Sequence, residues 1–331
     1  MTWIAFLVLA IGLLLAILFT GAKIFVGFLV LNIVGVLVLI GPRGFGLFSN
    51  SIFETATSPT LVTVALFVLM GEILFRSGTV DVLFQSVDRL VGRLRGRLYV
   101  VSIALSTVFG ALSGSAVAVA AMLGRSVLPL MEARDYDQRA SAATILAGAS
   151  LAPIIPPSLL AIIVGSLADV SIAGLLVAGI IPGLIFASLT LLFVYTRTGS
   201  MPPPEVAASD QSVSRAILMM LPFLLVIFSV MGLILLGVAT PSESAATGVV
   251  GAVIVAAVFG RLSLTMLREA IESAVTIAVV ILIIIVSAKL FSQLLSFAGA
   301  TRGLVTLMAD LGLGPEMTFL LMMLIPLVLC M

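Results

Sequence analysis

Apolar residues follow one another along this chain in long uninterrupted runs. Most runs approach the roughly 20 residues that a helix needs to cross a bilayer, and alternating strand patterns are absent. The runs cover 2–20, 24–40, 60–75, 98–131, 140–166, 172–196, 216–237, 243–260, 273–297 and 317–331. The pattern therefore predicts an all-α polytopic membrane protein.

One run is too long for a single crossing. A helix rises about 1.5 Å per residue, and the run at 98–131 is interrupted near its middle by Ser113, Gly114 and Ser115. Two limbs meeting at this interruption would form a re-entrant hairpin. A bilayer tolerates such a break only where protein or a wet cavity surrounds it. We therefore expect a re-entrant helical hairpin over 98–131.

The distribution of basic residues supports this topology. If 98–131 returns to the side from which it starts, nearly all loop arginines share one side. The positive-inside rule makes that side cytoplasmic and the N-terminus periplasmic. That side would hold Lys23, Arg76, Arg89, Arg93, Arg95, Arg97, Arg134, Arg139, Arg197, Arg215, Arg261 and Arg268, and the other side Arg43 and Arg302. A full crossing by 98–131 would largely remove the bias.

The order of segments indicates an internal duplication. From 60 and again from 273, a span is followed by a short amphipathic stretch (80–91 and 301–311) and a further apolar run. The first unit would start outside and the second inside. Inverted repeats with broken helices are typical of secondary transporters.

This duplication predicts the domain organisation. We expect a first repeat over 1–196, containing the hairpin and a broken helix at 140–166, then a cytoplasmic linker over 197–215 and an incomplete second repeat over 216–331. The last apolar run would be only the first limb of a second hairpin. We therefore expect the sequence to be truncated at its C-terminus.

The composition narrows the range of possible functions. Hydrophobic residues make up 62% of the chain and charged residues 9%, against roughly 25% charged residues in soluble domains, so the lipid bilayer must be the solvent. The net charge of +1 gives no electrostatic argument for nucleic-acid binding. The chain has no histidine and therefore lacks the commonest general base. It also lacks the glycine–lysine motif of a nucleotide-driven pump.

The hairpin tip is the first candidate site. One limb would end near Leu112 with free carbonyl groups, which suit a cation, and the next would begin near Ser115 with free N–H groups, which suit an anion. The hydroxyls of Ser113 and Ser115 can join either set, and Gly114 permits the turn. Close packing of small residues between helices would explain the same serines.

A second candidate lies in the segment LAPIIPPSLL, at 151–160. Pro153, Pro156 and Pro157 cannot all lie in an intact helix. We expect the chain to unwind between them and a new helix to start at Pro157 or Ser158. A broken helix facing a hairpin tip would resemble the ion sites of transporters, and a simple proline kink is the alternative.

Two further features could be functional: a pair of residues near a span end, which could contribute to the site, and a charge inside a span. Thr240 and Glu243 fit a capping box with Pro241 at the first helical position; capping alone would explain them, although Glu243 is an acid near a span end. Lys289 lies inside an apolar span, where a charge is often functional. It is also near enough to the span end to reach the interface by snorkelling.

Five motifs, taken together and in order, resemble the large membrane subunit of the TRAP (tripartite ATP-independent periplasmic) transporters, a DctM-type permease. They are LFVLMGEILFRSG (66–78), FGALSGSAVAVAA (109–121), LAPIIPPS (151–158), AGIIPGL (178–184) and ATPSESAA (239–246). Ala65 stands where the family usually has proline, and Ala116 where it often has a further hydroxyl. The family's second hairpin and second proline-broken helix are absent from this sequence.

The resemblance implies a sodium-driven elevator-type importer in the bacterial inner membrane. A periplasmic substrate-binding protein would deliver an organic acid, typically a carboxylate, and a small TRAP membrane subunit would support the large one. Ser113, Gly114 and Ser115 would belong to a sodium site together with the break at Pro156 and Pro157, next to Ser158. Sodium would be the coupling ion, and no other cofactor is expected.

Three other classes of protein are alternatives to this resemblance. A divalent-anion/sodium symporter-like carrier, working without a binding protein, would share the broken-helix physics. A channel or structural membrane protein is a further alternative. An intramembrane serine hydrolase would need a base for its serine, and the absence of histidine excludes the usual pair. We therefore expect a transporter and not an enzyme.

Overall fold

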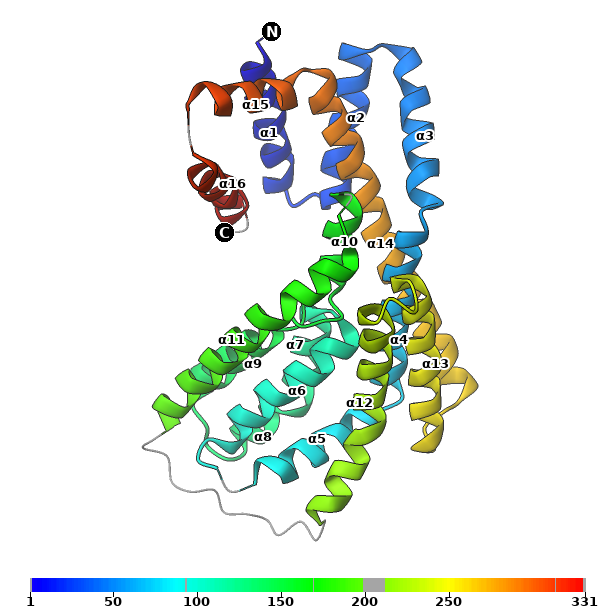
Figure 1. Ribbon diagram of the computed structural model, residues 1–331, viewed down its shortest axis with the longest axis vertical. Helices are drawn as coiled ribbons and strands as arrows, with labels where there is room; N and C mark the ends of the chain where they lie inside the picture. Colours follow the sequence, from blue (N-terminus) through cyan, green and yellow to red (C-terminus); the bar gives the residue numbers. More distant parts are fainter. Residues whose placement is uncertain (1, 93, 169, 199–211, 313, 330–331) are drawn as a thin grey trace. The chain divides into compact units, whose positions relative to one another are not determined.

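The computed structural model describes the chain except for residues 1, 93, 169, 199–211, 313 and 330–331. All of its regular elements are helices within that described part (Figure 1). In chain order they are α1 (Trp3–Phe19), α2 (Ile24–Leu39), the short 3-10 helix η1 (Pro42–Gly44), α3 (Phe45–Ala56), α4 (Pro59–Arg76), α5 (Thr79–Val91), α6 (Arg97–Ser113), α7 (Ala116–Ser126), α8 (Leu128–Glu132), α9 (Gln138–Ala149), α10 (Leu159–Leu167), α11 (Ile172–Thr198), α12 (Val213–Leu235), α13 (Pro241–Val258), α14 (Leu264–Phe297), α15 (Ala300–Asp310) and α16 (Pro315–Leu329). Most of the predicted linker at 197–215, and Arg93, lie outside the described residues.

Four helices are long and apolar enough to cross a membrane, judged by length and composition over the described residues. They are α11, α12, α13 and α14. The helices α3 and α4, which are consecutive in the sequence, would add a fifth span if counted as one. The helical structure and these spans confirm the prediction of an all-α polytopic membrane protein.

One helix was not predicted, and another begins earlier than predicted. Helix α3 was not expected, because the segment FGLFSNSIFETA carries too many polar residues to stand out as an apolar run. Helix α14 begins at Leu264 and not at Ser273, because the polar segment before the apolar run contains good helix formers such as leucine, arginine and glutamate. In both cases the helix includes polar residues, which an apolar run does not reveal.

The chain forms two compact units. Unit 1 contains residues 1–57 and 280–331, and unit 2 contains residues 58–279, so that helix α14 contributes to both. These units are defined by packing, whereas the predicted repeats concern internal symmetry. The division into two repeats therefore stays a prediction.

Unit 1 packs α1, α2 and α3 around the second half of α14. One apolar cluster joins Val36 and Phe48 to Leu290 and Leu294. The rings of Phe28 and Phe291 meet edge to face, with centroids 5.3 Å apart. Residues from the two ends of the sequence thus share one core.

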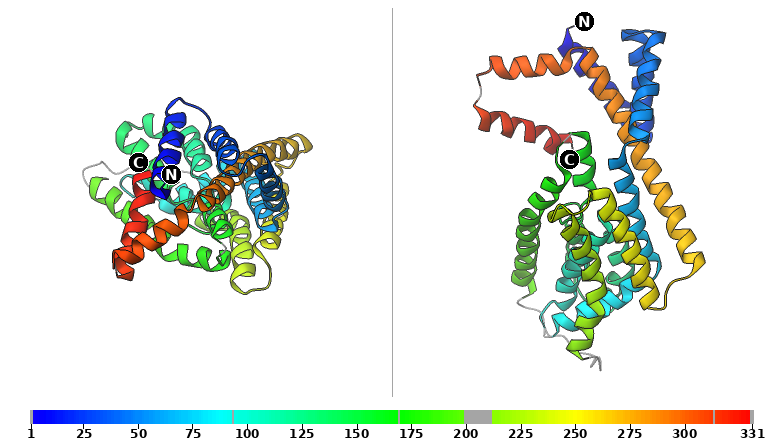
Figure 2. Two further views of the ribbon diagram at one scale, coloured as in Figure 1. Left: turned by 90° about the horizontal axis from the view of Figure 1, so that it is seen from above. Right: turned by 45° about the vertical axis from the view of Figure 1, so that its right-hand side comes forward.

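Unit 2 is built around α4, which packs against α13, α6 and α10. Helices α6, α9 and α11 lie side by side (Figures 1 and 2). The amphipathic helix α5 buries Val80, Leu83 and Val87 in contact with α6 and α12. This arrangement surrounds both predicted helix breaks with helices.

Candidate ion-binding site at two helix breaks

The interruption predicted at 113–115 is present. Helix α6 ends at Ser113, and Gly114 follows with a φ of 61°, a left-handed conformation that glycine adopts without steric cost. Ser115 then caps helix α7, and its Oγ accepts a hydrogen bond of 3.3 Å from the N–H of Ala118. The break therefore follows from local chemistry.

The chain turns back at this break. The ring of Tyr99, at the start of α6, meets the ring of Tyr136, which follows α8, with centroids 5.0 Å apart. Helices α6 and α7 also contact each other. Both ends of the segment consequently lie together, and Gly114 and Ser115 form its tip.

The second predicted break is also present. Helix α9 ends at Ala149 and α10 begins at Leu159, with turns and bends between them. The hydroxyl of Ser158 accepts a hydrogen bond of 3.2 Å from the N–H of Ala161 and donates one to the carbonyl of Pro153. Ser158 thus caps the new helix and bridges the break, close to where the sequence placed the helix start.

The two breaks lie against each other. A β-carbon on Gly114 would lie 3.0 Å from the backbone nitrogen of Leu159, and one on Gly110 would lie 2.9 Å from the Cα of Ala152. Larger residues at these two glycines would collide with backbone. The structure therefore brings the hairpin tip and the proline break into direct contact.

Glycines from two more helices complete this contact. A β-carbon on Gly71 in α4 would lie 2.9 Å from the Cα of Ser113, and one on Gly179 in α11 would lie 2.6 Å from the carbonyl oxygen of Ile154. Both glycines belong to motifs noted in the sequence, yet nothing local predicted their partners. Their role is to let α4 and α11 approach the breaks at backbone distance.

The polar groups at the breaks are uncharged oxygens. Ser113 is 5% exposed and Ser158 is 1% exposed, and the N–H of Ser115 donates a long hydrogen bond of 3.4 Å to the Oγ of Ser113. The last carbonyl groups of α6 have no following helical turn to donate to them. Hydroxyl and carbonyl oxygens suit a hard cation better than a transition metal. Over the described residues no group of three or more His, Cys, Asp or Glu could hold a metal ion.

The structure does not bring Thr240 and Glu243 to the breaks. They form the predicted capping box of α13: the Thr240 N–H donates to the Glu243 carboxylate at 2.8 Å, and the Glu243 N–H donates to the Thr240 hydroxyl at 3.3 Å. Their neighbour Ser242 shares a hydrogen bond of 2.5 Å with Thr63 of α4. Thr63 is about 12 Å along the axis from Gly71, at 1.5 Å per residue. Helix capping accounts for both residues.

Lys289 forms an ion pair in unit 1. Its Nζ lies 3.0 Å from the carboxylate of Glu54 near the end of α3. Sequence reasoning singled out the lysine but missed its partner, because α3 itself was not predicted. The pair is separate from the helix breaks, which belong to unit 2.

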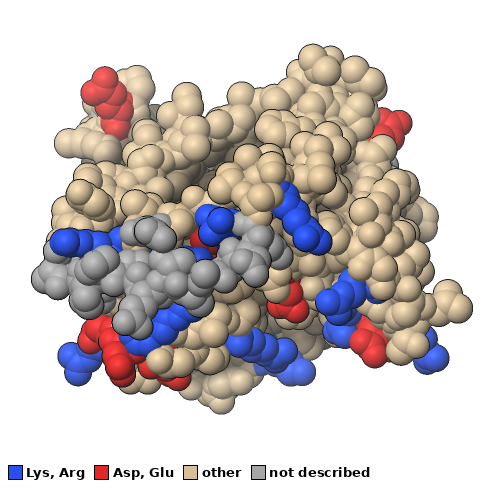
Figure 3. Space-filling model, turned by 90° about the horizontal axis from the view of Figure 1, so that it is seen from below, with Lys and Arg blue, Asp and Glu red and all other residues tan. Residues whose placement is uncertain are grey.

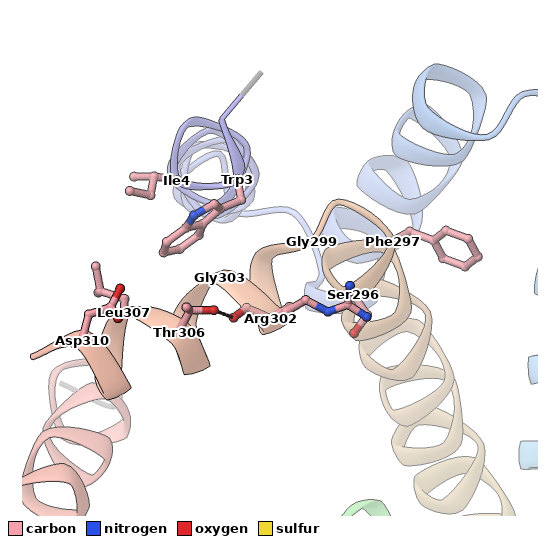
Figure 4. A pocket seen from close by; sticks show the side chains of 10 residues that line it. All are labelled: Trp3, Ile4, Ser296, Phe297, Gly299, Arg302, Gly303, Thr306, Leu307 and Asp310. Carbon is pink, nitrogen blue, oxygen red and sulfur yellow. Dashed lines mark hydrogen bonds between the residues drawn. The ribbon is translucent and has the colours of Figure 1, made fainter. Parts of the chain in front are cut away.

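A cavity of about 660 Å³ lies in unit 1 between α1, the end of α14 and α15. Figure 4 shows the ring of Trp3 over α15 near Gly303, with Arg302 and Thr306 below it and Asp310 further along. The cavity contains none of the predicted site residues.

Arginine and acidic side chains lie at one end of unit 2. Figure 3 shows the molecule from below, where basic side chains are spread over the face and alternate with acidic ones. Arg76 at the end of α4 reaches Glu269 near the start of α14 at 3.3 Å. A β-carbon on Gly78 would lie 4.0 Å from a guanidinium nitrogen of Arg261, after α13. The loops that follow α4 and α13 are thus neighbours.

Comparison with known families supplies a context for this site. A family described as the tripartite ATP-independent periplasmic transporter, DctM component, matches residues 3–331. Protein YgiK of Salmonella typhimurium is 38% identical over 68% of this chain and 52% of its own length. The C4-dicarboxylate TRAP transporter large permease protein DctM of Pseudomonas aeruginosa is 27% identical over 86% of this chain and 67% of its own. The sialic acid TRAP transporter large permease protein SiaM of Vibrio cholerae is 28% identical over 85% of this chain and 66% of its own. The chain thus spans about half to two thirds of the length of these curated relatives.

Proposed function

Because the chain belongs to the family of the DctM component of tripartite ATP-independent periplasmic transporters, a transport family and not an enzyme family, we propose that it is the membrane permease subunit of a sodium-driven importer for an organic acid. A periplasmic substrate-binding protein delivers the acid, and a small membrane subunit supports the permease. The protein is a multi-pass protein of the bacterial inner membrane, with its N-terminus in the periplasm. Two relatives are described as permeases for C4-dicarboxylate and sialic acid, which supports a carboxylate as the substrate class.

The observation that carries this proposal is the contact between the two helix breaks. The C-terminal end of α6 carries a partial negative charge from its aligned peptide dipoles, which favours a cation. Pro156 lacks the N–H that would otherwise bond to the carbonyl of Ala152, and Ala152 packs against Gly110, one turn before the hairpin tip. We place sodium among these carbonyls and the hydroxyls of Ser113 and Ser115, and leave Thr240 and Glu243 outside the site.

The same contact has a consequence for the way the two helix breaks move during transport. Gly110 and Gly114 allow backbone-to-backbone packing between α6 and the segment around α10, and such packing resists sliding. The re-entrant hairpin and the broken helix therefore move as one body when the carrier alternates, which is the behaviour of an elevator-type carrier.

Reconstitution tests the proposal. The full-length gene product that contains this chain is placed in proteoliposomes with a small membrane subunit and a periplasmic binding protein of the same transport system, and uptake of labelled dicarboxylates and sialic acid is measured. We expect uptake to need both the binding protein and an inward sodium gradient, because each sodium entering at 100 mV releases about 2.3 kcal/mol. Uptake that needs sodium but no binding protein would indicate a symporter-like carrier, and uptake indifferent to sodium would exclude the proposed coupling.

A second measurement addresses the sodium site itself. Sodium should raise the thermal unfolding temperature of the purified chain relative to choline at equal ionic strength, because a ligand that binds only the folded state stabilises it. This readout does not depend on the partners or on the substrate.

A further inference from the structure

We propose that the groove between α12 and α13 binds an anionic phospholipid, with an acyl chain in the groove and the phosphate at Arg215 and Arg261. The groove has a volume of about 680 Å³, within the range of roughly 300–1,000 Å³ typical of ligand pockets. It is lined almost entirely by apolar side chains. They include Leu218, Pro222, Leu225, Gly251, Ile254 and Phe259.

The sequence explains why a groove forms here. Gly251 contributes no side chain, and a β-carbon at this position would lie 3.0 Å from the side chain of Val226, so the floor of the groove is closely packed. Leu225 and Ile254 remain more than half exposed on its walls. Both helices meet the length and composition expected of membrane spans. An empty groove at the lipid boundary would forfeit dispersion contacts, so an apolar chain must fill it.

One end of the groove carries positive charge. Arg215 precedes Leu218 by three residues and Pro222 by seven, which places it on the same stripe of α12. At the end of α13, Gly260 has a φ of 65° and the Arg261 N–H bonds to the Ala256 carbonyl at 2.8 Å, which holds Arg261 just beyond Phe259. Arg215 therefore lies just before the lining residues of α12, and Arg261 lies just after those of α13.

Two contacts between the helices show how they are aligned. Gly251 lies against Val226, and the rings of Phe223 and Phe259 are stacked with centroids 5.8 Å apart, so the helices are antiparallel and the third turn of α12 lies beside the end of α13. Arg215 lies about 12 Å further along α12, toward the same end of the groove as Arg261. Arg215 and Arg261 are both exposed. Within the part of the chain that the structure describes, neither has an acidic side chain within ion-pair distance, whereas Arg76, Arg97 and Arg268 do.

A charged end joined to an apolar groove matches an amphiphile. A guanidinium group forms paired hydrogen bonds with phosphate oxygens, and free N–H groups at the start of α12 favour an anion at the same end. A transmembrane helix from a partner would also fill the groove, but it would match both arginines only if it carried acidic residues at this end, whereas an anionic lipid always brings its phosphate. Basic positions between membrane helices are recognised sites for anionic lipid head groups.

Native mass spectrometry tests this site. The full chain is placed in nanodiscs of phosphatidylcholine with or without phosphatidylglycerol, extracted into mild detergent, and analysed for retained lipid. We expect phosphatidylglycerol to be retained in preference to phosphatidylcholine. Arg215→Gln with Arg261→Gln should reduce this preference by about fivefold for each arginine removed, while Arg139→Gln, an exposed arginine on α9, should leave it unchanged.

A photo-crosslinking residue in place of Leu225 identifies what lies in the groove. We expect a phospholipid adduct, and we expect Gly251→Leu to suppress it by filling the floor, with size-exclusion elution confirming that the variant is folded. Equal retention of both lipids, or no effect of the two arginine substitutions, would refute the proposal. A crosslink to a polypeptide would assign the groove to a protein partner and would equally refute it.

Discussion

In unit 1 and in unit 2, helices from distant parts of the sequence pack together, but the groups between them differ. In unit 1, polar side chains join α14 to α2 and α3. The Asn32 amide donates to the carbonyl of Ser287 at 2.8 Å, and the Ser51 hydroxyl donates to Gln293 at 2.8 Å, one turn from the ion pair of Lys289. In unit 2, glycines and serines bring backbones together at the helix breaks, and charged side chains lie at one end.

The difference indicates which kind of interaction, hydrogen bonding or close packing, stabilises each unit. Hydrogen bonds between membrane helices are directional and contribute about 0.6–2 kcal/mol each, so they set the register of α3 and α14. Glycine contacts depend on shape instead, because an added methyl group would collide with backbone atoms of the neighbouring segment, which cannot shift aside. Unit 1 should therefore lose a little stability with each polar contact that is removed. Unit 2 should lose much more stability when a single one of these glycines is replaced by a larger residue.

The amphipathic helices α5 and α15 extend the comparison. Each follows a left-handed glycine, Gly78 with a φ of 66° and Gly299 with a φ of 75°. Helix α5 buries three apolar side chains, whereas Ala300 is the buried residue of α15. Similar local sequence signals thus start both helices, and only their neighbours decide how much of each is covered.

The largest effect is expected at the contact between the breaks. Gly110→Val should destabilise the protein by about 1–3 kcal/mol through overpacking and should abolish stabilisation by sodium, because the added side chain meets the backbone of Ala152. Thermal unfolding with sodium and with choline measures both quantities. Gly124→Val in α7 is the control, since nothing lies within 4 Å of a β-carbon there. Equal behaviour of the two variants would contradict the role of the contact.

The next effect concerns the hydroxyls of the proposed sodium site. Ser113→Ala with Ser115→Ala should raise the sodium concentration for half-maximal stabilisation at least tenfold, because a hydrogen-bonding group facing a charge contributes roughly 1.5–3 kcal/mol. Membrane insertion and helix content should stay normal. An unchanged sodium dependence would assign both serines to helix packing.

A smaller effect is expected from the ion pair of unit 1. Lys289→Ala and Glu54→Ala should each lower stability by about 1 kcal/mol, because the glutamate is largely exposed and such pairs contribute little. The exchange Glu54→Lys with Lys289→Glu should recover most of the loss. A double-mutant cycle measured by thermal unfolding gives the coupling energy. Additive single losses, without recovery in the exchange, would show that the pair does not link α3 to α14.

An effect of similar size on stability, with none on sodium binding, separates capping from ion binding. Thr240→Ala should cost about 1 kcal/mol by removing the cap of α13 and should leave the sodium response unchanged, because the cap lies away from the helix breaks. Thr240→Ser, which keeps the hydroxyl, is the matched control. A shift in sodium dependence for the alanine variant alone would place the second half of the chain in the site.

The features that could be predicted are those with local causes. Apolar runs specify the spans, Gly114 and the prolines interrupt helices by their own backbone chemistry, and Thr240 with Glu243 forms a cap within one turn. Helix α3 was not predicted because its sequence contains no apolar run; it packs against other helices of unit 1 through residues such as Phe48. Glu54 was missed with it, although a search for an acid at a comparable depth to Lys289 could have suggested the pair.

By itself, the sequence determined a helical membrane protein, its two helix breaks and its resemblance to a transporter family, since each depends on residues close together in the chain. Only the tertiary structure decided that the breaks touch, that Gly71 and Gly179 close around them, and that Thr240 lies apart. It also decided which arginines keep no acidic partner among the described residues. The physical reason is that these relations depend on packing between segments far apart in sequence, for which no short pattern carries a signal.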